Sequence, residues 1–326
     1  MRRHPPKFGR ERGVAVITAL LLTTLAVAIV ASLFWQQQVQ VRSMENQRLH
    51  LQTKWILRGA LDWSTLVLDT FGGATTYTSL DQAWATPLAD TRLDQYIERE
   101  RVEGENFDAS LSGGITDASS RYNLTNLAAN RVRNDGQVKI FERLLRNLQL
   151  QEALARRVAD VVAASQPVQV PQDGQPPINQ TTASTVQGKP IALLQVDDLL
   201  SVPGFTPELV ERLRPFVIVL PEPTPVNVNT APPEVLAALV PNMSVSEANA
   251  LAARRKQAPW RDMSYFLAEL HGRNLEENSA DVKSSWFLVA SRIRLDRAAL
   301  DAEALLQRGS VLNAGGGTKV VWIRQN

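Results

Sequence analysis

The hydrophobic pattern is strongest near the start of the chain, where one apolar run extends from Val14 to Phe34. Its polar members all carry hydroxyl groups: Thr18, Thr23, Thr24 and Ser32. A helix of this length spans about 30 Å, the thickness of the hydrocarbon core of a bilayer. Threonine and serine hydroxyls can bond back to helix carbonyls, so they are tolerated there. The run therefore predicts one membrane-spanning helix.

The helical pattern continues beyond this span. From Val39 to about Asp69 there is no proline, and Gly59 is the single glycine. Apolar residues recur near one side of this helix: Met44, Leu51, Trp55 and Leu66. This spacing predicts that the same face packs on a soluble domain. The helix is expected to stop at Phe71-Gly72-Gly73, because glycine accepts the left-handed conformation at helix ends.

Alternating apolar and polar residues predict a small sheet built from both ends of the remaining chain. In the first part these are Tyr96 to Val102 and Phe107 to Tyr122, with a turn at Gly113-Gly114. In the last part they are Trp286 to Arg294, Ala299 to Gln307 and Lys319 to Arg324, although Leu295 to Leu306 is equally compatible with a helix. A long helix on an antiparallel sheet makes an α+β fold.

The middle of the chain has helical periodicity. The predicted helices are Asp135 to Leu150, Gln151 to Ser165, Ala231 to Leu239 and Val245 to Lys256. Asp197 to Pro207 reads as a helix and a glycine hairpin leading into a second helix, and Gln166 to Pro190 as a loop. In the link before Ala231, the side chains of Asn227, Asn229 and Thr230 are expected to cap the next helix and to bond the backbone of their own turn.

Charge is distributed unevenly along the chain. The overall net charge is +2, but the basic residues before Gly13 make the N-terminus strongly positive, while the rest is slightly acidic. The positive-inside rule then places the N-terminus in the cytoplasm and the bulk of the chain across the membrane. There is no cysteine, which excludes disulfides and thiolate zinc sites, and the three histidines are scattered.

Three interpretations of the N-terminus remain open: a plain anchor, a cleaved signal peptide and a prepilin-type leader. Ala26-Val27-Ala28 is a small-x-small site, but the apolar run continues past it. Arg12-Gly13-Val14 directly precedes the apolar run. Prepilin peptidases cut after such a glycine, which here would leave Val14 as the first residue of the mature chain.

Several stretches then resemble the minor pseudopilin K family of type II secretion systems. They are Leu80 to Pro87, Gly114 to Leu127 and, most specifically, Val226-Asn227-Val228-Asn229-Thr230-Ala231 followed by Glu234-Val235-Leu236. The resemblance implies a type IV pilin-like fold, in which a long N-terminal transmembrane helix packs on an antiparallel sheet. It also implies a large all-α insertion with helix-hairpin-helix or SAM-like modules, which contains the insertion motif Asn227, Asn229 and Thr230.

The same resemblance implies a function without catalysis. A K-type subunit sits at the tip of the pseudopilus, helps to start its assembly, and takes part in export of folded proteins across the outer membrane. Its partners would be the minor pseudopilins I and J, then H and the major pseudopilin G, together with prepilin peptidase and the inner membrane, with the bulk of the chain in the periplasm. Thr18 takes the fifth mature position, where most pilin-like subunits carry glutamate, and its identity fits a tip subunit.

On this basis we divide the chain by residue number. The leader is 1–13, the membrane part of the long helix 14–34, its periplasmic part 35–73 and the first part of the sheet 74–122. A first helical, SAM-like domain is 123–225, a second, helix-hairpin-helix-like domain 226–283, and the C-terminal strands 284–326.

Helix-hairpin-helix pairs often bind DNA, so a membrane-anchored DNA receptor is the alternative function. From Gln195 to Pro221, however, Arg212 and Arg214 are outnumbered by four carboxylates, whereas phosphate contacts require positive charge. The second helix pair is more basic, but we interpret those residues as a solvated face. We therefore expect neither nucleic acid nor a small-molecule substrate as a partner.

An enzyme is disfavoured because the chain has none of the usual nucleophile, zinc or phosphate-loop motifs. The adjacent carboxylates Asp197 and Asp198 point in different directions on a helix, so capping explains them better than acid/base catalysis.

No cofactor is expected with certainty. The family resemblance implies a structural calcium, but the stretch Asp160 to Gln166 has one carboxylate where relatives are rich in aspartate. Calcium requires six to eight oxygen ligands. The metal ligands therefore stay unknown, and the segments Asn106 to Asp108 and Asp117 to Asn126 are candidates only.

Overall fold

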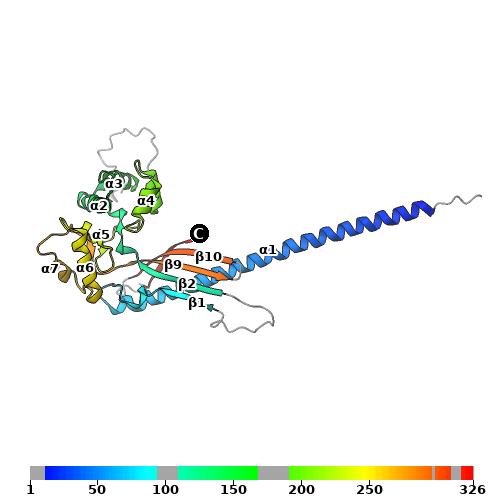
Figure 1. Ribbon diagram of the computed structural model, residues 1–326, viewed down its shortest axis with the longest axis horizontal. Helices are drawn as coiled ribbons and strands as arrows, with labels where there is room; N and C mark the ends of the chain where they lie inside the picture. The colour runs from blue at the N-terminus through cyan, green and yellow to red at the C-terminus, as the bar shows by residue number, and fades with distance from the viewer. Residues whose placement is uncertain (1–11, 94–108, 168–190, 296–297, 310–316, 326) are drawn as a thin grey trace, which may run out of the picture.

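The computed structural model describes residues 12–93, 109–167, 191–295, 298–309 and 317–325. Its longest element is a single helix, α1 (Arg12–Ala74), which projects far beyond the rest of the molecule (Figure 1). The predicted continuous helix is confirmed, and it ends one residue after the predicted glycine stop. The threonine hydroxyls of its apolar half donate to helix carbonyls, as expected; Thr18 Oγ1, for example, donates to Ala15 O over 3.0 Å.

The C-terminal half of α1 packs on an antiparallel five-stranded sheet with the strand order β1-β2-β9-β10-β11. These strands are β1 (Leu88–Arg92), β2 (Ala109–Asp117), β9 (Trp286–Leu295), β10 (Ala298–Gln307) and β11 (Lys319–Gln325). The three predicted C-terminal strands are confirmed. The alternative interpretation of Leu295 to Leu306 as a helix is wrong, because β10 pairs with β9 along its whole length. The predicted strand from Tyr96 to Val102 lies outside the described residues.

The predicted turn at Gly113-Gly114 is wrong, because both glycines lie inside β2. Instead, Gly113 allows the backbones of β2 and β9 to lie close together. A Cβ atom at Gly113 would lie 2.1 Å from the carbonyl oxygen of Ala290 on β9. Strand β2 then ends at Asp117, earlier than predicted, and the chain turns into the 3-10 helix η3 (Ala118–Ser120).

Each face of the sheet has its own apolar cluster. On the face covered by α1, Leu57, Leu61 and Leu68 pack with buried strand residues such as Phe287 and Ile293. A second cluster brings together β9 and β10 residues with the short strand β6 of the insertion: Trp286, Leu288, Leu305, Ile218, Leu220 and Ala118. The long helix therefore covers one face of the sheet, and the β6 segment of the insertion contacts the other.

The insertion forms two groups of helices at the end of the molecule away from the N-terminal half of α1 (Figure 1). The first group contains α2 (Asp135–Asn147), α3 (Leu154–Ser165), η5 (Val196–Ser201) and α4 (Pro207–Leu213). The second contains α5 (Pro233–Leu239), α6 (Val245–Gln257) and α7 (Met263–Glu269). One apolar core runs through both groups. The predicted helices are confirmed, except that Val196–Ser201 is a 3-10 helix.

Short elements connect these parts. They are η1 (Ala83–Ala85), β3 (Tyr122–Asn123), η4 (Leu124–Leu127), β4 (Ala128–Ala129), β5 (Val132–Arg133), β6 (Val217–Ile218), β7 (Val226–Asn227) and β8 (Ala280–Asp281). Strands β3 and β6 pair in parallel, as do β7 and β8. The chain thus leaves the sheet after β2 and returns to it at β9 through paired strands.

Candidate functional site: helix faces and the domain junction

The N-terminal part of α1 has the properties of a membrane anchor. The stretch Ala15–Phe71 is long and apolar enough to cross a membrane, and none of its most apolar window is buried in the protein. Gly13 and Val14, the predicted cleavage position, lie in the first turn of α1. Thr18 lies one turn further along, within the apolar part.

The C-terminal half of α1 has two apolar faces, and the sheet covers the one that was not predicted. The covered face carries Leu57, Ala60, Leu61, Ser64 and Leu68, all buried. The four residues predicted to pack on the head are exposed instead: Met44, Leu51, Trp55 and Leu66. Trp55 is 75% exposed, whereas Leu61 is 2% exposed. The prediction of the packed face is therefore wrong.

We call these four exposed residues the outer stripe of α1. A Cβ atom at Gly59, on the same side, would meet nothing within 4 Å, so another chain could approach the helix closely there. The exposed ion pair between Arg58 and Asp62 lies between Trp55 and Leu66 along the helix, so the apolar stripe is interrupted by charged residues. Exposed apolar side chains that recur on one side of a helix are suited to contact with a partner helix. The outer stripe is consequently a candidate assembly surface.

The residues of the insertion motif lie in a buried junction between the sheet and the helices. Asn227, at the end of β7, is fully buried. Its Nδ2 lies within hydrogen-bond distance of Thr78 O (3.0 Å), Asp117 Oδ2 (2.9 Å) and Ser284 Oγ (2.8 Å). Its Oδ1 accepts from the amide of Asn229 over 2.9 Å. One side chain thereby joins the end of β2, the segment after α1 and the segment before β9.

Asn229 and Thr230 extend the same junction. Asn229 exchanges two hydrogen bonds with the backbone of Trp260, at 2.8 and 2.9 Å, and Thr230 Oγ1 donates to Asp117 Oδ2 over 2.6 Å. The predicted bonding within the turn is confirmed, but the predicted capping of the next helix is wrong. The N-cap residue of α5 is Pro232, which makes no side-chain cap, because the motif's side chains bond to more distant partners.

Asp117 accepts four hydrogen bonds in the junction. Its carboxylate receives bonds from Asn227, Thr230, Ser284 (2.6 Å) and the amide of Ser119 (2.8 Å). Burial raises the pKa of Asp117 above its ordinary value of 3.8, and these four hydrogen bonds oppose that rise. In the sequence Asp117 was only a metal candidate, because three of its four partners lie more than a hundred residues away.

A buried arginine adjoins this carboxylate. Arg308 Nη2 donates to Thr78 Oγ1 (2.8 Å) and to Ser284 O (2.5 Å). Within the described residues its Nη1 has no hydrogen-bond partner, and the guanidinium lies over the Phe287 ring, 4.9 Å from its centroid. Burial lowers the pKa of Arg308, while the charge of Asp117 opposes that shift. The junction is thus a polar network enclosed by both domains.

The proposed metal candidates have other partners. Asn106 to Asp108 lies outside the described residues. In the segment Asp117 to Asn126, Asn123 bonds the backbone of Glu222 and Leu220, and Asn126 bonds both backbone groups of Thr224. Among the described residues, no three histidine, aspartate or glutamate side chains are grouped as a metal site would require. The calcium expectation stays a prediction without an identified ligand set.

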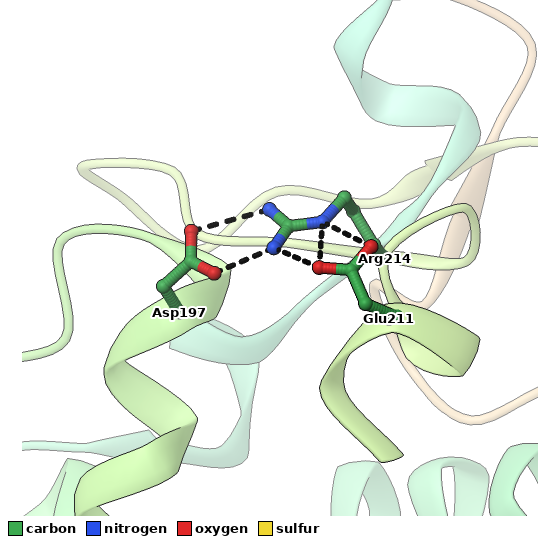
Figure 2. A network of polar contacts seen from close by, with 3 residues as sticks. All are labelled: Asp197, Glu211 and Arg214. Carbon is green, nitrogen blue, oxygen red and sulfur yellow. Dashed lines mark hydrogen bonds and ion pairs between the residues drawn. The ribbon is translucent and has the colours of Figure 1, made fainter. Parts of the chain in front are cut away.

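The first helix pair of the insertion has its basic residues engaged within the protein. Figure 2 shows Arg214 between Asp197 and Glu211, with its Nη2 2.5 Å from Asp197 Oδ1 and 2.7 Å from Glu211 Oε1. These contacts lower the pKa of both carboxyls and raise that of Arg214. Arg212 donates to Leu148 O. This arrangement leaves little positive charge for a phosphate backbone and disfavours DNA binding at this pair.

Asp198 has the predicted capping role. Its Oδ2 accepts from the amides of Leu194 (2.7 Å) and Gln195 (3.0 Å) at the start of η5. Asp197 instead pairs with Arg214. The two adjacent carboxylates thus have separate structural partners, as expected for residues that point in different directions.

Comparison with known proteins places this architecture in a family. Two family models described as "Type II secretion system (T2SS), protein K" match residues 120–222 and 226–289. A type II secretion system protein K from Pseudomonas aeruginosa is 31% identical over 313 residues, which cover 92% of this chain and 89% of the relative. The corresponding protein from Aeromonas hydrophila is 26% identical and covers 98% of both chains.

A solved structure has the same fold. It is the GspK-GspI-GspJ complex from enterotoxigenic Escherichia coli, in which the matching chain aligns with a TM-score of 0.64 and 20% identity, covering 87% of this chain and 99% of that chain. The mixed helix and sheet architecture with its long apolar helix agrees with this likeness. On the extent and identity of these matches, the chain belongs to the type II secretion system protein K family, the minor pseudopilin K of that system.

Proposed function

We propose that this protein is the tip subunit of the type II secretion pseudopilus, acting as a non-catalytic subunit that starts the assembly. The observation that carries the proposal is the position of the helical insertion. Helices α2 to α7 lie beyond the sheet, at the end away from the apolar half of α1 (Figure 1). Where pilin-like subunits stack along parallel helices, this bulk would obstruct a subunit above but leave the lower side free.

The partners in this proposal are the minor pseudopilins I and J, followed by H and the major pseudopilin G. The related K protein of known structure was solved in complex with GspI and GspJ. In this chain the outer stripe of α1 supplies an apolar surface that the protein's own head leaves uncovered. Association along this stripe would bury it against a neighbouring helix.

Membrane insertion follows from the same helix. We place residues 1–13 in the cytoplasm, the apolar half of α1 in the inner membrane and the head in the periplasm, in accordance with the basic N-terminus. Prepilin peptidase would cut between Gly13 and Val14. Thr18, whose hydroxyl donates to Ala15 O, would replace a glutamate that subunits further down pair with a neighbour.

Two measurements test these assignments separately. The N-terminal mass of the membrane-extracted protein, with and without prepilin peptidase, tests processing: we expect a chain beginning at Val14 only when the peptidase is present. Size-exclusion chromatography of the full chain with I and J, in neutral detergent, tests assembly. Co-elution of all three supports the proposal, whereas separate elution at high concentration contradicts it.

A further inference from the structure

A groove lies between α6 and α7, in the second helical group. It has a volume of about 710 Å³ and is lined mainly by Leu251, Arg254, Pro259, Arg261, Tyr265 and His271. This volume falls in the range of ligand-binding clefts in proteins. The groove adjoins the domain junction at Trp260, whose backbone bonds Asn229 and which also lines the groove.

The groove has an apolar floor and an exposed aromatic side chain. Leu251 and Pro259 are half-buried, and Trp260 is buried against Phe266, with ring centroids 4.9 Å apart. Tyr265 is 63% exposed. Since a tyrosine offers a flat apolar ring and a phenol group, it is well suited to contact an extended peptide.

The charges at the groove are asymmetric. The carboxylate of Glu269 is 13% exposed, and it accepts from Trp260 Nε1 and pairs with Arg254 Nη1, both at 2.9 Å. This ion pair uses one of the five N–H donors of Arg254, whose side chain is 63% exposed. Arg261 is exposed and makes no ion pair with any described residue. The groove therefore offers guanidinium donors beside an apolar floor, while its one carboxylate is already paired.

We propose that this groove binds an extended acidic peptide segment of another protein. Carboxylates of the segment would pair with Arg261 and with the free donors of Arg254, since guanidinium and carboxylate groups match in geometry. Its aliphatic side chains would lie on Pro259 and beside Tyr265. Two guanidiniums over an apolar floor fit a peptide better than a nucleic acid, which requires a longer basic track. The inference stands independently of the tip assignment.

The test is fluorescence anisotropy on the full chain in neutral detergent. The probe is a fluorescein-labelled octapeptide of alternating glutamate and leucine, and the reference peptide carries glutamine in place of glutamate. We expect the acidic peptide to bind at least about tenfold more tightly, and its affinity to fall with added salt. Equal binding of both peptides, or no binding of either, would overturn the proposal.

Variants locate the site. Arg261→Glu and, separately, Tyr265→Ala each change an exposed side chain, and both are expected to weaken binding of the acidic peptide about tenfold. Arg294→Glu makes the same charge change at an exposed position on β9 and should leave binding unchanged. Equal weakening by Arg294→Glu would indicate non-specific attraction and contradict the site. Tighter binding of a fluorescein-labelled oligonucleotide, lost in Arg261→Glu, would assign the groove to nucleic acid instead.

Discussion

Asn227 Nδ2 lies 2.9 Å from Asp117 Oδ2, across 110 positions of sequence. This contact ties the end of β2 to the strand that begins the second helical group. Both side chains are buried, and together they hold the two segments through which the chain leaves and re-enters the sheet. The junction therefore fixes how the insertion sits on the pilin-like head.

Asn227→Ala is expected to destabilise the folded protein. It would leave Thr78 O without its 3.0 Å partner and remove one of the four donors to Asp117. A buried polar group without a partner costs about 1–3 kcal/mol, which should appear as a lower free energy of unfolding in urea. Asn249→Ala, on the exposed side of α6, is the control and should change it by less than about 0.5 kcal/mol. Equal effects of the two substitutions would contradict a structural role for the junction.

The buried carboxyl of Asp117 should give stability a distinct pH dependence. Burial raises its folded pKa above 3.8, so between 3.8 and that raised value the folded protein holds a proton that the unfolded chain has lost. This group's contribution to the free energy of unfolding is therefore greatest below 3.8 and decreases as the pH rises through the folded pKa.

Asp117→Asn should abolish that decrease, although it lowers stability overall by about 1–3 kcal/mol because an amide cannot accept all four hydrogen bonds. Urea unfolding at several pH values measures both effects. Glu247→Gln is the comparison, because ion pairing lowers the pKa of Glu247 to about 2. The contribution of Glu247 to the free energy of unfolding is present above pH 4.5 and lost as the pH falls toward 2. Glu247→Gln removes this contribution, and the decrease in stability that Asp117 causes as the pH rises should remain. If the unfolding free energy of Asp117→Asn depended on pH as that of the unchanged protein does, the raised pKa of Asp117 would be refuted.

Gly113→Ala should disrupt the centre of the sheet. The added Cβ would lie 2.1 Å from the backbone oxygen of Ala290, so β2 and β9 would have to separate, at a cost of about 1–3 kcal/mol or more. Gly59→Ala is the matched control, and it should change the unfolding free energy in the opposite direction. Its Cβ meets nothing within 4 Å in a helix interior, and alanine there should stabilise by about 0.5–1 kcal/mol. Unfolding free energies that do not differ would contradict the close strand approach.

Local pattern predicted much of the fold. The apolar run gave α1, helical spacing gave α2, α3, α5 and α6, and alternation gave β9, β10 and β11. These elements are predictable because burial on one face imposes a period on the sequence. The domain limits drawn from the sequence stay predictions, as does the cleavage between Gly13 and Val14.

The errors arose where distant contacts decide the outcome. Gly113 looked like a turn residue, because its approach to Ala290 on β9 cannot be read from neighbouring residues. The motif asparagine looked like a helix cap, but its partners Thr78 and Ser284 are 149 and 57 positions away. On α1, periodicity detected an apolar face but could not indicate which of two faces the sheet would cover.

The uncovered face supplies the last prediction. Trp55→Glu with Leu66→Glu would place two charges on the outer stripe, where both side chains are exposed, so the head should keep its unfolding free energy. Burying such charges against a partner helix without a counter-ion is costly, and we expect co-elution with I and J to be lost. Val132→Glu with Leu200→Glu, two exposed apolar positions on β5 and η5, is the matched control and should co-elute normally. Retained co-elution of the α1 variant, or loss in both, would show that the outer stripe is not the assembly surface.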